Sequence, residues 1–539
     1  MRGILVALAA VSLVRPPLPA QQPVTSSRHL GTVRFAISCN AAVRPRFNQA
    51  VALLHSFAFP EAVASFNAVL REDPHCAIAA WGLALSAWGN PFAPGSRSAE
   101  QLRSGQAAVD RARNTGKPTA RERGYIDAVV QLYEHADSLS QRARLIGYRD
   151  AMAALTAQAP SDTEAAIFHA LAQSVAADPA DKSYTSQLAA GATLERLFAV
   201  MPDHPGLAHY IIHTYDVPAL AHRALAAAER YSQIAPGMSH ALHMPSHVYT
   251  RVGAWQESID ANVAAAAAAH REGAVAEELH SGDYQVYAYL QTGQDRAARR
   301  VVASLPAVAR RLDPTRITTG APPAAGYFAI AAIPARYALE RGDWADAARL
   351  ERLPSPVPYA DAVTCFARAV GAARSGDTLG AKAAILELGR IRDSLADQHE
   401  AYWRDQVEIQ VLDATAWEAL AAGRNAEALA TMRAAADRED ATEKSVVSPG
   451  PLAPARELLG EMLLSLRNPA EALAAFETAL VHEPNRFRSV AGAAESARAA
   501  GDSASAGRYY DQLLRLGAGA DRPGRPALAD AARFTGHQP

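Results

Sequence analysis

Small and large apolar residues recur at fixed intervals along the chain, and the clearest stretch begins at residue 453. Counted from there, apolar or small residues occupy positions 7, 8, 11, 20, 24 and 27, and a proline occupies position 32: Leu459, Gly460, Leu463, Ala472, Phe476, Ala479 and Pro484. Spacings of three and four put such residues on one face of a helix, and a proline ends the helix before it. The pattern predicts two antiparallel helices within 34 residues.

The same register recurs along most of the chain. It predicts repeats over 43–76, 171–204, 205–238, 239–272, 279–312, 328–361, 362–395, 409–442, 453–486 and 487–520. A glycine often stands at the turn between the two helices, where a positive φ can be needed: Gly253, Gly293, Gly342, Gly376, Gly423 and Gly501. Residues 111–170 fit the register poorly and are predicted to be helical. The segments 314–323, 354–358 and 445–454 are predicted insertions, and 521–539 a loose tail.

This register resembles the tetratricopeptide repeat, in which small residues at positions 8 and 20 let paired helices touch. The resemblance implies an all-α fold with one array over residues 43–520, wound as a right-handed superhelix (an α–α solenoid). It also implies that positions 2, 5, 9, 12 and 13 of each first helix line a concave groove. Such a groove would bind a protein, a peptide or a small ligand. The stretches 208–216 and 240–253, with the segment 47–92, also resemble an uncharacterised subgroup of exported bacterial proteins with these repeats.

The amino-acid composition is typical of closely packed helices, and the net charge argues against one class of partner. The 539 residues are 49% hydrophobic but only 7% aromatic, and alanine is abundant, as in the run 264–269. Alanine favours helices and lets them approach closely, which argues against a β-sandwich or barrel. The formal net charge of −2 argues against a nucleic-acid-binding protein, because such domains are usually strongly basic.

The N-terminal residues have the pattern of a secretory signal peptide. Arg2 precedes an apolar run over 3–14, and a proline-rich segment then ends in Ala20. The run is short for a membrane span, which needs about 20 apolar residues. We therefore expect residues 1–20 to be a signal peptide, residues 21–42 an N-terminal extension, and the protein to be periplasmic or secreted, with no membrane span. The alternative is an ordinary N-terminal helix.

The chain has three cysteines, which an oxidising compartment would allow to pair. Cys39 and Cys76 bracket the first predicted hairpin, so they are the disulfide candidate, and two buried reduced thiols are the alternative. Cys365 is left over and is expected to pack as a small hydrophobic side chain.

Histidines gather at the predicted groove positions of three neighbouring repeats. Six of the chain's 17 histidines lie there, together with two aspartates: His209, His213, His240, His243, His247, His280, Asp216 and Asp283. Residues four apart on a helix share one face, so the pairs could chelate one metal ion. Imidazole with carboxylate suits zinc, iron, copper, nickel or manganese, and an aspartate could bind the ion or orient an imidazole. Otherwise, the histidines could bind an anionic peptide terminus, bond to nearby tyrosines or be solvated.

Two further features bear on the groove. Pro245 lies within a predicted first helix and should kink it or delay its start. Four other residues are weaker groove candidates, and the tryptophans among them could equally be core residues: His55, Trp81, Trp88 and Tyr287.

The sequence therefore leaves two functions open. One is a binding or scaffold protein that uses its groove; the other is a metal-dependent enzyme or metal-handling protein that uses the histidines. Neither His-x-x-x-His carries the glutamate of a zinc-protease motif, and no nucleotide-binding glycine loop follows a strand pattern. No catalytic residue is assigned.

Overall fold

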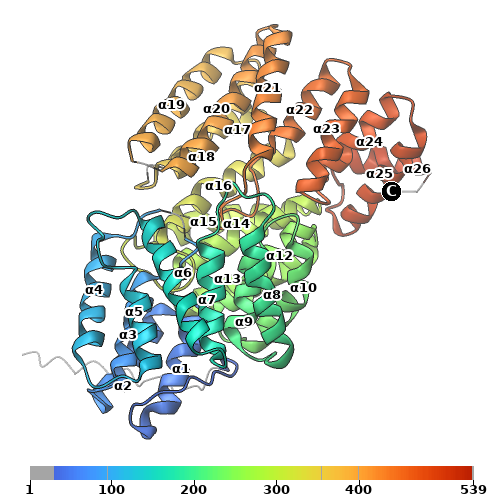
Figure 1. Ribbon diagram of the computed structural model, residues 1–539. Helices are drawn as coiled ribbons and strands as arrows, with labels where there is room; N and C mark the ends of the chain where they lie inside the picture. The colour runs from blue at the N-terminus through green and yellow to red at the C-terminus, as the bar shows by residue number, and fades with distance from the viewer. Residues whose placement is uncertain (1–28, 94, 354, 399, 537–539) are drawn as a thin grey trace, which may run out of the picture.

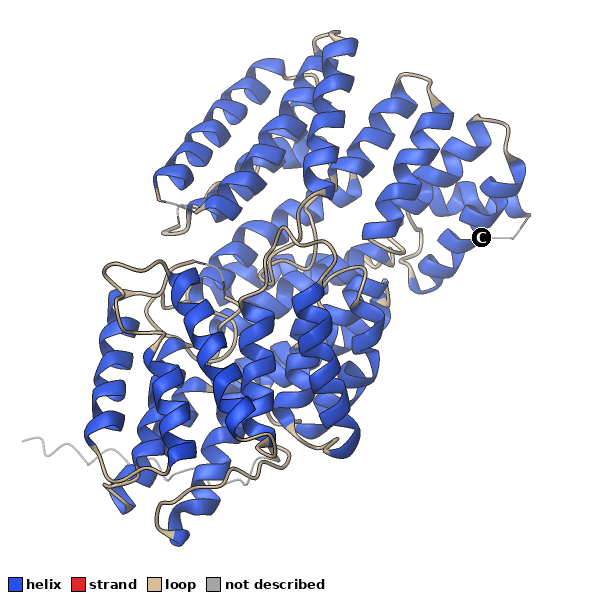
Figure 2. Cartoon of the chain, viewed as in Figure 1, coloured by secondary structure: helices blue, strands red, loops and turns tan. Residues whose placement is uncertain are grey.

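The structure, a computed structural model, describes residues 29–536 except 94, 354 and 399. These residues form helices joined by loops, with no strand among them (Figure 2). The predicted all-α class is confirmed. The predicted signal peptide (1–20) and the start of the extension after it lie outside the described residues.

The N-terminal helices pack mostly on their neighbours in sequence. After a short 3-10 turn at Ala41–Val43 they are α1 (Arg44–His55), α2 (Phe59–Glu72), α3 (Ala77–Trp88), α4 (Ala99–Asn114), α5 (Ala120–Val130), α6 (Gln141–Gln158), α7 (Thr163–Val175) and α8 (Thr185–Val200). The region 111–170, expected to be helical, contains α5, α6 and the start of α7.

The middle helices carry the histidines. They are α9 (Pro205–Thr214), a 3-10 turn at Ala221–Ala224, α10 (Leu225–Ile234), α11 (Ser239–His243), α12 (Pro245–Val252), α13 (Trp255–Glu272), α14 (Val275–Gln291), α15 (Asp295–Ala309) and α16 (Pro323–Arg341). The interruption between α11 and α12 falls at Met244 and Pro245, where the proline predicts it.

The C-terminal helices continue the series of hairpins. They are α17 (Trp344–Ala348), α18 (Pro358–Arg374), α19 (Thr378–Asp397), α20 (Ala401–Ala421), α21 (Asn425–Asp440), α22 (Ala455–Ser465), α23 (Pro469–His482), α24 (Phe487–Ala499), α25 (Ser503–Leu516), a 3-10 turn at Gly517–Gly519, and α26 (Pro526–Thr535). The segment 521–539, expected to be a loose tail, contains α26. This helix packs on α25, and Ala531 and Ala532 are buried.

The hairpin turns and contacts follow the sequence pattern. All six glycines predicted at turns between helices have φ between 69° and 83°, a region that favours glycine. The large residue at position 24 fills the space left by the small one at position 8: a Cβ added at Gly460 would lie 2.8 Å from the Phe476 ring. The structure is therefore a tetratricopeptide-like array of stacked helical hairpins.

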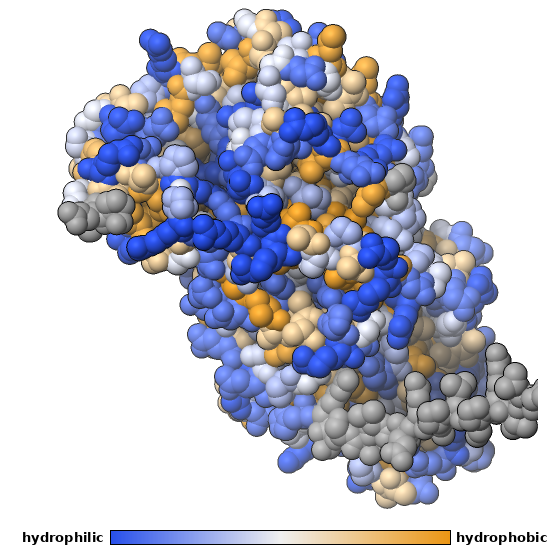
Figure 3. Space-filling view, turned by 180° about the vertical axis from the view of Figure 1, so that it is seen from behind, coloured by the Kyte–Doolittle hydropathy of each residue, from blue (hydrophilic) through white to orange (hydrophobic). Residues whose placement is uncertain are grey.

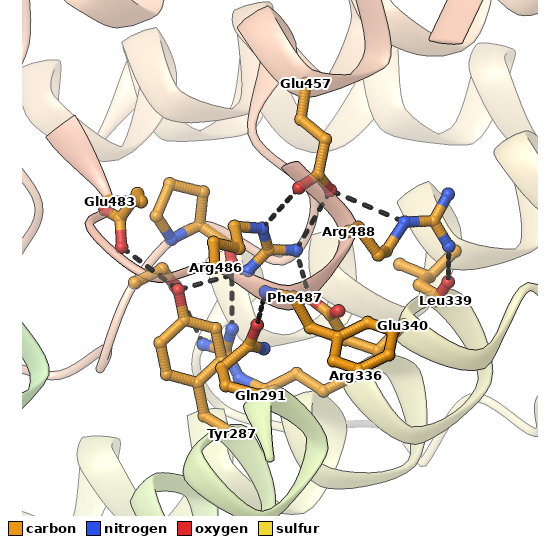
Figure 4. A network of polar contacts seen from close by, with 12 residues as sticks. Tyr287, Gln291, Arg336, Leu339, Glu340, Glu457, Glu483, Arg486, Phe487 and Arg488 are labelled. Atoms are coloured by element: carbon orange, nitrogen blue, oxygen red, sulfur yellow. Dashed lines mark hydrogen bonds and ion pairs between the residues drawn. The ribbon is translucent and has the colours of Figure 1, made fainter. Parts of the chain in front are cut away.

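The C-terminal hairpins also contact the middle of the chain. In Figure 1 the hairpins of α22–α26 lie to the right of the middle of the chain, and α24 contacts α14. In Figure 4, Arg486 reaches Glu457, Glu340 and the Tyr287 hydroxyl, all buried. Gln291 of α14 accepts from the Phe487 amide at 2.9 Å. These contacts fix the last hairpins against the helices that carry the histidines.

The cysteines and the lengths of the helices bear on two predictions from the sequence. A disulfide joins Cys39 to Cys76, and Cys365 is buried as a free cysteine. Among the described residues, no helix is both long and apolar enough to cross a membrane. Figure 3 shows one face of the molecule, on which hydrophilic side chains prevail and apolar patches are small.

Candidate metal centre

The six predicted histidines meet in the interior of the array. Helix α9 supplies two of them, α11 two, α12 one and α14 one: His209, His213, His240, His243, His247 and His280. Each side chain is buried, with at most 7% of the residue exposed. The structure divides them into two groups of three, and within each group one ligand nitrogen per residue lies within 4.8 Å of the others. The two groups could each hold a metal ion.

The first group consists of His209, His213 and His240. The Nδ1 of His209 lies 2.7 Å from the backbone carbonyl of His55, and the Nδ1 of His240 lies 3.2 Å from a Glu277 carboxylate oxygen. The Nε2 atoms of His209 and His240 face each other at 3.2 Å. Within the described part of the chain, neither ring nitrogen of His213 has a hydrogen-bond partner.

The second group consists of His243, His247 and His280 and repeats this arrangement. The Nδ1 of His243 lies 2.7 Å from Asn262 Oδ1, and the Nδ1 of His247 lies 2.9 Å from Asp216 Oδ2. The Nε2 atoms of His243 and His247 are 3.0 Å apart. The Nδ1 of His280 has no partner among the residues described.

The partners of the Nδ1 atoms fix where the protons are. A carbonyl or carboxylate oxygen only accepts hydrogen bonds. Asn262 also presents its oxygen to His243, because its Nδ2 donates to the Ser258 carbonyl at 2.7 Å. The four Nδ1 atoms of these imidazoles therefore carry the protons. In the neutral ring the Nε2 atom then has a lone pair, so each Nε2–Nε2 contact brings two lone pairs together unless a proton or a cation lies between them.

Burial disfavours the proton. It lowers the pKa of His209, His213 and His243 well below the usual value, and neighbouring imidazoles lower it further. Burial also lowers the pKa of His280 to about 3. Neutral imidazole is the form that binds metal ions.

Charged residues around the histidines are paired. Burial opposes the ionisation of Asp216, but Lys444 and Arg251 outweigh burial and hold its pKa well below the usual range. Arg251 Nε donates to Asp216 Oδ1 at 2.9 Å, and Lys444 Nζ lies 3.2 Å from the same carboxylate. Glu277 is likewise held ionised, because its interactions with His240 outweigh burial and lower its pKa. Asp216 and Glu277 thus resemble the carboxylates that orient ligating imidazoles.

The histidines do not line an open groove, although the repeat register predicts one there. Loops from three parts of the chain cover them. Phe92, after α3, stacks on His213 with ring centroids 4.3 Å apart, and Gly320, before α16, lies so close to His240 that an added Cβ would be 2.2 Å from the ring. The loop between α21 and α22 supplies Val446 and Val447 to a small pocket that reaches His213, His240, His247 and His280.

The remaining predicted site residues lie elsewhere. Asp283, a predicted ligand, pairs with Arg336 at 2.8 Å, and both side chains are fully buried. Tyr287 donates to Glu483 at 3.0 Å, in the network of Figure 4. Trp81 is buried in the core against Phe35, Tyr125 and Phe168, the alternative that the sequence leaves open. Trp88 is buried and lines an apolar pocket.

His55 belongs to a third buried group, with Glu164 and His204. Both histidines place Nε2 3.0 Å from a Glu164 oxygen, and His55 Nδ1 lies 2.9 Å from the Tyr210 hydroxyl. The ligand atoms that would face an ion are thus already hydrogen-bonded to one another. This group is a hydrogen-bond network beside the first histidine group, to which His55 contributes its carbonyl.

Sequence reasoning missed Glu277, Asn262 and Lys444. Glu277 lies three residues before His280, a spacing that shares a helix face, so the signal was present. Lys444 comes from a loop 228 residues away from Asp216, and no local pattern marks it.

Comparison with known proteins adds little to this geometry. No protein-family model matches the sequence, and no curated protein matches it. Among solved structures, the P58(IPK) TPR domain is 13% identical, with 65% of this chain and 94% of that one covered, at a TM-score of 0.21. The human IFIT1 dimer with PPP-AAAA is 10% identical, with coverages of 89% and 96%, at a TM-score of 0.32. Scores of this size add nothing to the hairpin packing described above.

Proposed function

We propose that this protein is a helical repeat protein that binds transition-metal ions, one in each group of three histidines. The observation that carries the proposal is the pair of Nε2–Nε2 contacts, 3.2 Å between His209 and His240 and 3.0 Å between His243 and His247. Metal–nitrogen bonds are about 2.0–2.1 Å, so two nitrogens on one tetrahedral ion lie about 3.3 Å apart. The contacts fit shared ions and are unfavourable without them.

The donor set points to a class of metal. All six candidate ligands are imidazoles, and imidazole suits zinc, copper, iron and nickel. Asp216 and Glu277 would hold two of the rings in the ligating tautomer. Manganese, which prefers oxygen ligands, fits less well.

A metal-dependent enzyme is the second candidate function. Three protein ligands leave a coordination position free, as in catalytic zinc sites. The small pocket that touches His213, His240, His247 and His280 would give a small molecule access to that position. Binding of a peptide along a groove is less supported at these repeats, because loops cover the histidines.

Metal analysis tests the proposal. The protein is purified without chelator, and bound metal is measured by elemental analysis beside His213→Ala, His247→Ala and the control His270→Ala, whose side chain is 64% exposed. We expect about two ions per wild-type and control chain and at most one in each of the first two variants. Equal metal content in all four proteins, or none in any, would refute the proposal.

Export is a separate part of the proposed function. The Cys39–Cys76 disulfide supports it, because disulfides persist in oxidising compartments. Expression of the full chain in a bacterium, followed by intact-mass measurement of the periplasmic fraction, should find residues 1–20 removed. Protein retained in the cytoplasm at full mass would contradict export.

A further inference from the structure

The two histidine groups lie directly against each other. Between the groups, the ring centroids of His213 and His247 are 6.1 Å apart, and those of His240 and His243 are 6.3 Å apart. Within the groups the separations are just as large, 6.4 Å for His213 and His240 and 6.1 Å for His247 and His280. An ion bonded to a ring nitrogen lies about 3.2 Å from the centre of that ring. Rings at these separations therefore allow two ions, one in each group, to come within the ~3.5–4 Å of two-metal sites.

One small cavity touches both groups. His213 and His240 of the first group line it, and so do His247 and His280 of the second. The cavity gives the centre of a water-sized molecule about 20 Å³, and about 10–15 Å³ of such space is enough for one water. It therefore fits one very small ligand beside both groups and is too small for an organic substrate.

The rest of the cavity wall offers little that would hold a polar ligand. Its other side chains are apolar, apart from that of Asn90. Asn90 is already engaged, because its Nδ2 donates to the Gly320 carbonyl and its Oδ1 accepts from the Phe92 amide, both at 2.9 Å. A buried water needs two to four polar partners. A ligand in this cavity would thus depend on metal ions for its binding.

Charge favours an anion there. Two divalent ions would bring four positive charges into the interior, because the six imidazoles are neutral when they bind metal. In the described part of the chain, the carboxylates bonded to these rings are Asp216 and Glu277, and both Arg251 and Lys444 face Asp216. Positive charge therefore exceeds negative charge at the centre, and an unpaired buried charge is unfavourable. Water on a zinc ion loses a proton at about pH 7, so the solvent supplies hydroxide as the anion.

We propose that the two ions form one dinuclear centre, in which a hydroxide ion in the cavity bridges them. Three histidines leave each ion with a free coordination position, and the bridge fills both positions with one ligand. Other anions of this size would bind in its place. This inference rests on the proposed binding of two ions and adds what connects them.

Copper is the probe, because the unpaired electrons of two Cu²⁺ ions report whether one atom bridges them. Metal-free full-length protein is loaded with Cu²⁺ and desalted, bound copper is measured by elemental analysis, and its spins are counted by electron paramagnetic resonance. We expect two ions per chain, a signal that accounts for only a small part of them, and a half-field transition from the coupled pair. The variant His247→Ala is the control: it should keep one ion, in the first group, and its signal should account for all of its copper.

Fluoride and acetate test the size of the ligand. Fluoride is about as large as hydroxide, so it should replace the bridge and change the wild-type spectrum, whereas acetate exceeds the cavity and should not. Two bound ions whose signal accounts for all the copper, without a half-field transition, would overturn the dinuclear centre and leave the two metal sites standing. Fewer than two bound ions would overturn both proposals. Equal effects of fluoride and acetate, or no effect of either, would overturn the assignment of the bridge to this cavity.

Discussion

The substitution Glu277→Gln tests the metal site through a residue that does not bind the ion. Glu277 is fully buried, and three donors converge on its carboxylate. His240 Nδ1 donates to one oxygen at 3.2 Å, and the Thr319 hydroxyl and the Ala321 amide donate to the other at 2.6 and 3.1 Å. Glutamine keeps the size of the side chain but replaces one acceptor with an amide donor.

The structure sets the expected magnitude. If the glutamine oxygen stays with Thr319 and Ala321, its amide group faces His240 Nδ1, which must then accept. The proton moves to Nε2, the atom that would bind the ion. To bind the ion through Nε2, the His240 ring must carry its proton on Nδ1, where it faces the buried amide N–H of the glutamine. Two donors that face each other cost about 1–3 kcal/mol. Loss of such a second-shell partner typically weakens metal binding about 10- to 100-fold, and we expect a loss of this size.

The measurement is a competition titration against a chelator of known affinity, with the metal that elemental analysis identifies. Glu278→Gln is the matched control, because Glu278 is the next residue on α14 and its carboxylate contacts His270 and Arg311 instead. We expect the control to bind within about twofold of wild type. If Glu277→Gln and wild type bind the metal equally, the assignment of His240 as a ligand through Nε2 is wrong.

Three further predictions concern stability. Metal-free protein should lose stability as the pH falls from 7 to 5. Burial lowers the pKa of His209, His213 and His243 well below the usual histidine value of about 6.5, so the unfolded chain takes up protons that the folded one does not. The loss should reach up to about 1.4 kcal/mol per pH unit for each histidine. Urea titrations at several pH values measure this, and a flat profile would contradict it. Replacing Cys39 and Cys76 with serine should lower the free energy of unfolding by about 4 kcal/mol, because the disulfide spans 37 residues and reduces the conformational entropy of the unfolded chain. Thiol titration of the denatured wild type should find one free thiol, and three would refute the bridge. Arg486→Met leaves Glu340 buried without its cation and leaves Glu457 with Arg488 alone, 3.5 Å away. It should cost about 3–5 kcal/mol by calorimetry, whereas Arg498→Met, at an exposed position, should have little effect.

Much of the fold could be predicted because the contacts that build a hairpin are local. Gly460 and Phe476 meet within one repeat, and the glycines at the turns follow the same register. Contacts between distant repeats leave no such pattern. The Tyr287 hydroxyl donates to Glu483, 196 residues away. Tyr287 is a groove candidate in the sequence, but nothing there pairs it with Glu483. The return of the C-terminal hairpins to the middle of the chain therefore required the structure.

Part of the candidate site could be predicted for the same reason. The four-residue spacing of His209 and His213, and of His243 and His247, predicts that each pair lies on one face of a helix. The spacing cannot show that the six histidines divide into two groups, because that depends on how α9, α11, α12 and α14 pack. The groove positions of the repeat also group Asp283 with the histidines. Almost every residue of α14 is buried, so this helix has several inward faces, and Asp283 lies on the one that meets Arg336.

The insertions between repeats bring distant parts of the chain to the histidines. Stacked hairpins need only short turns, yet the loops after α15 and α21 are long and fold over the histidines. The first loop supplies Thr319 and Ala321 to Glu277, and the second supplies Lys444 to Asp216. Each loop thus helps to keep ionised a carboxylate that orients an imidazole. A groove for peptides would gain nothing from these loops, because they close it. A buried metal centre needs them, because they bring two neutral donors to Glu277 and the Lys444 cation to Asp216, and they cover the histidines.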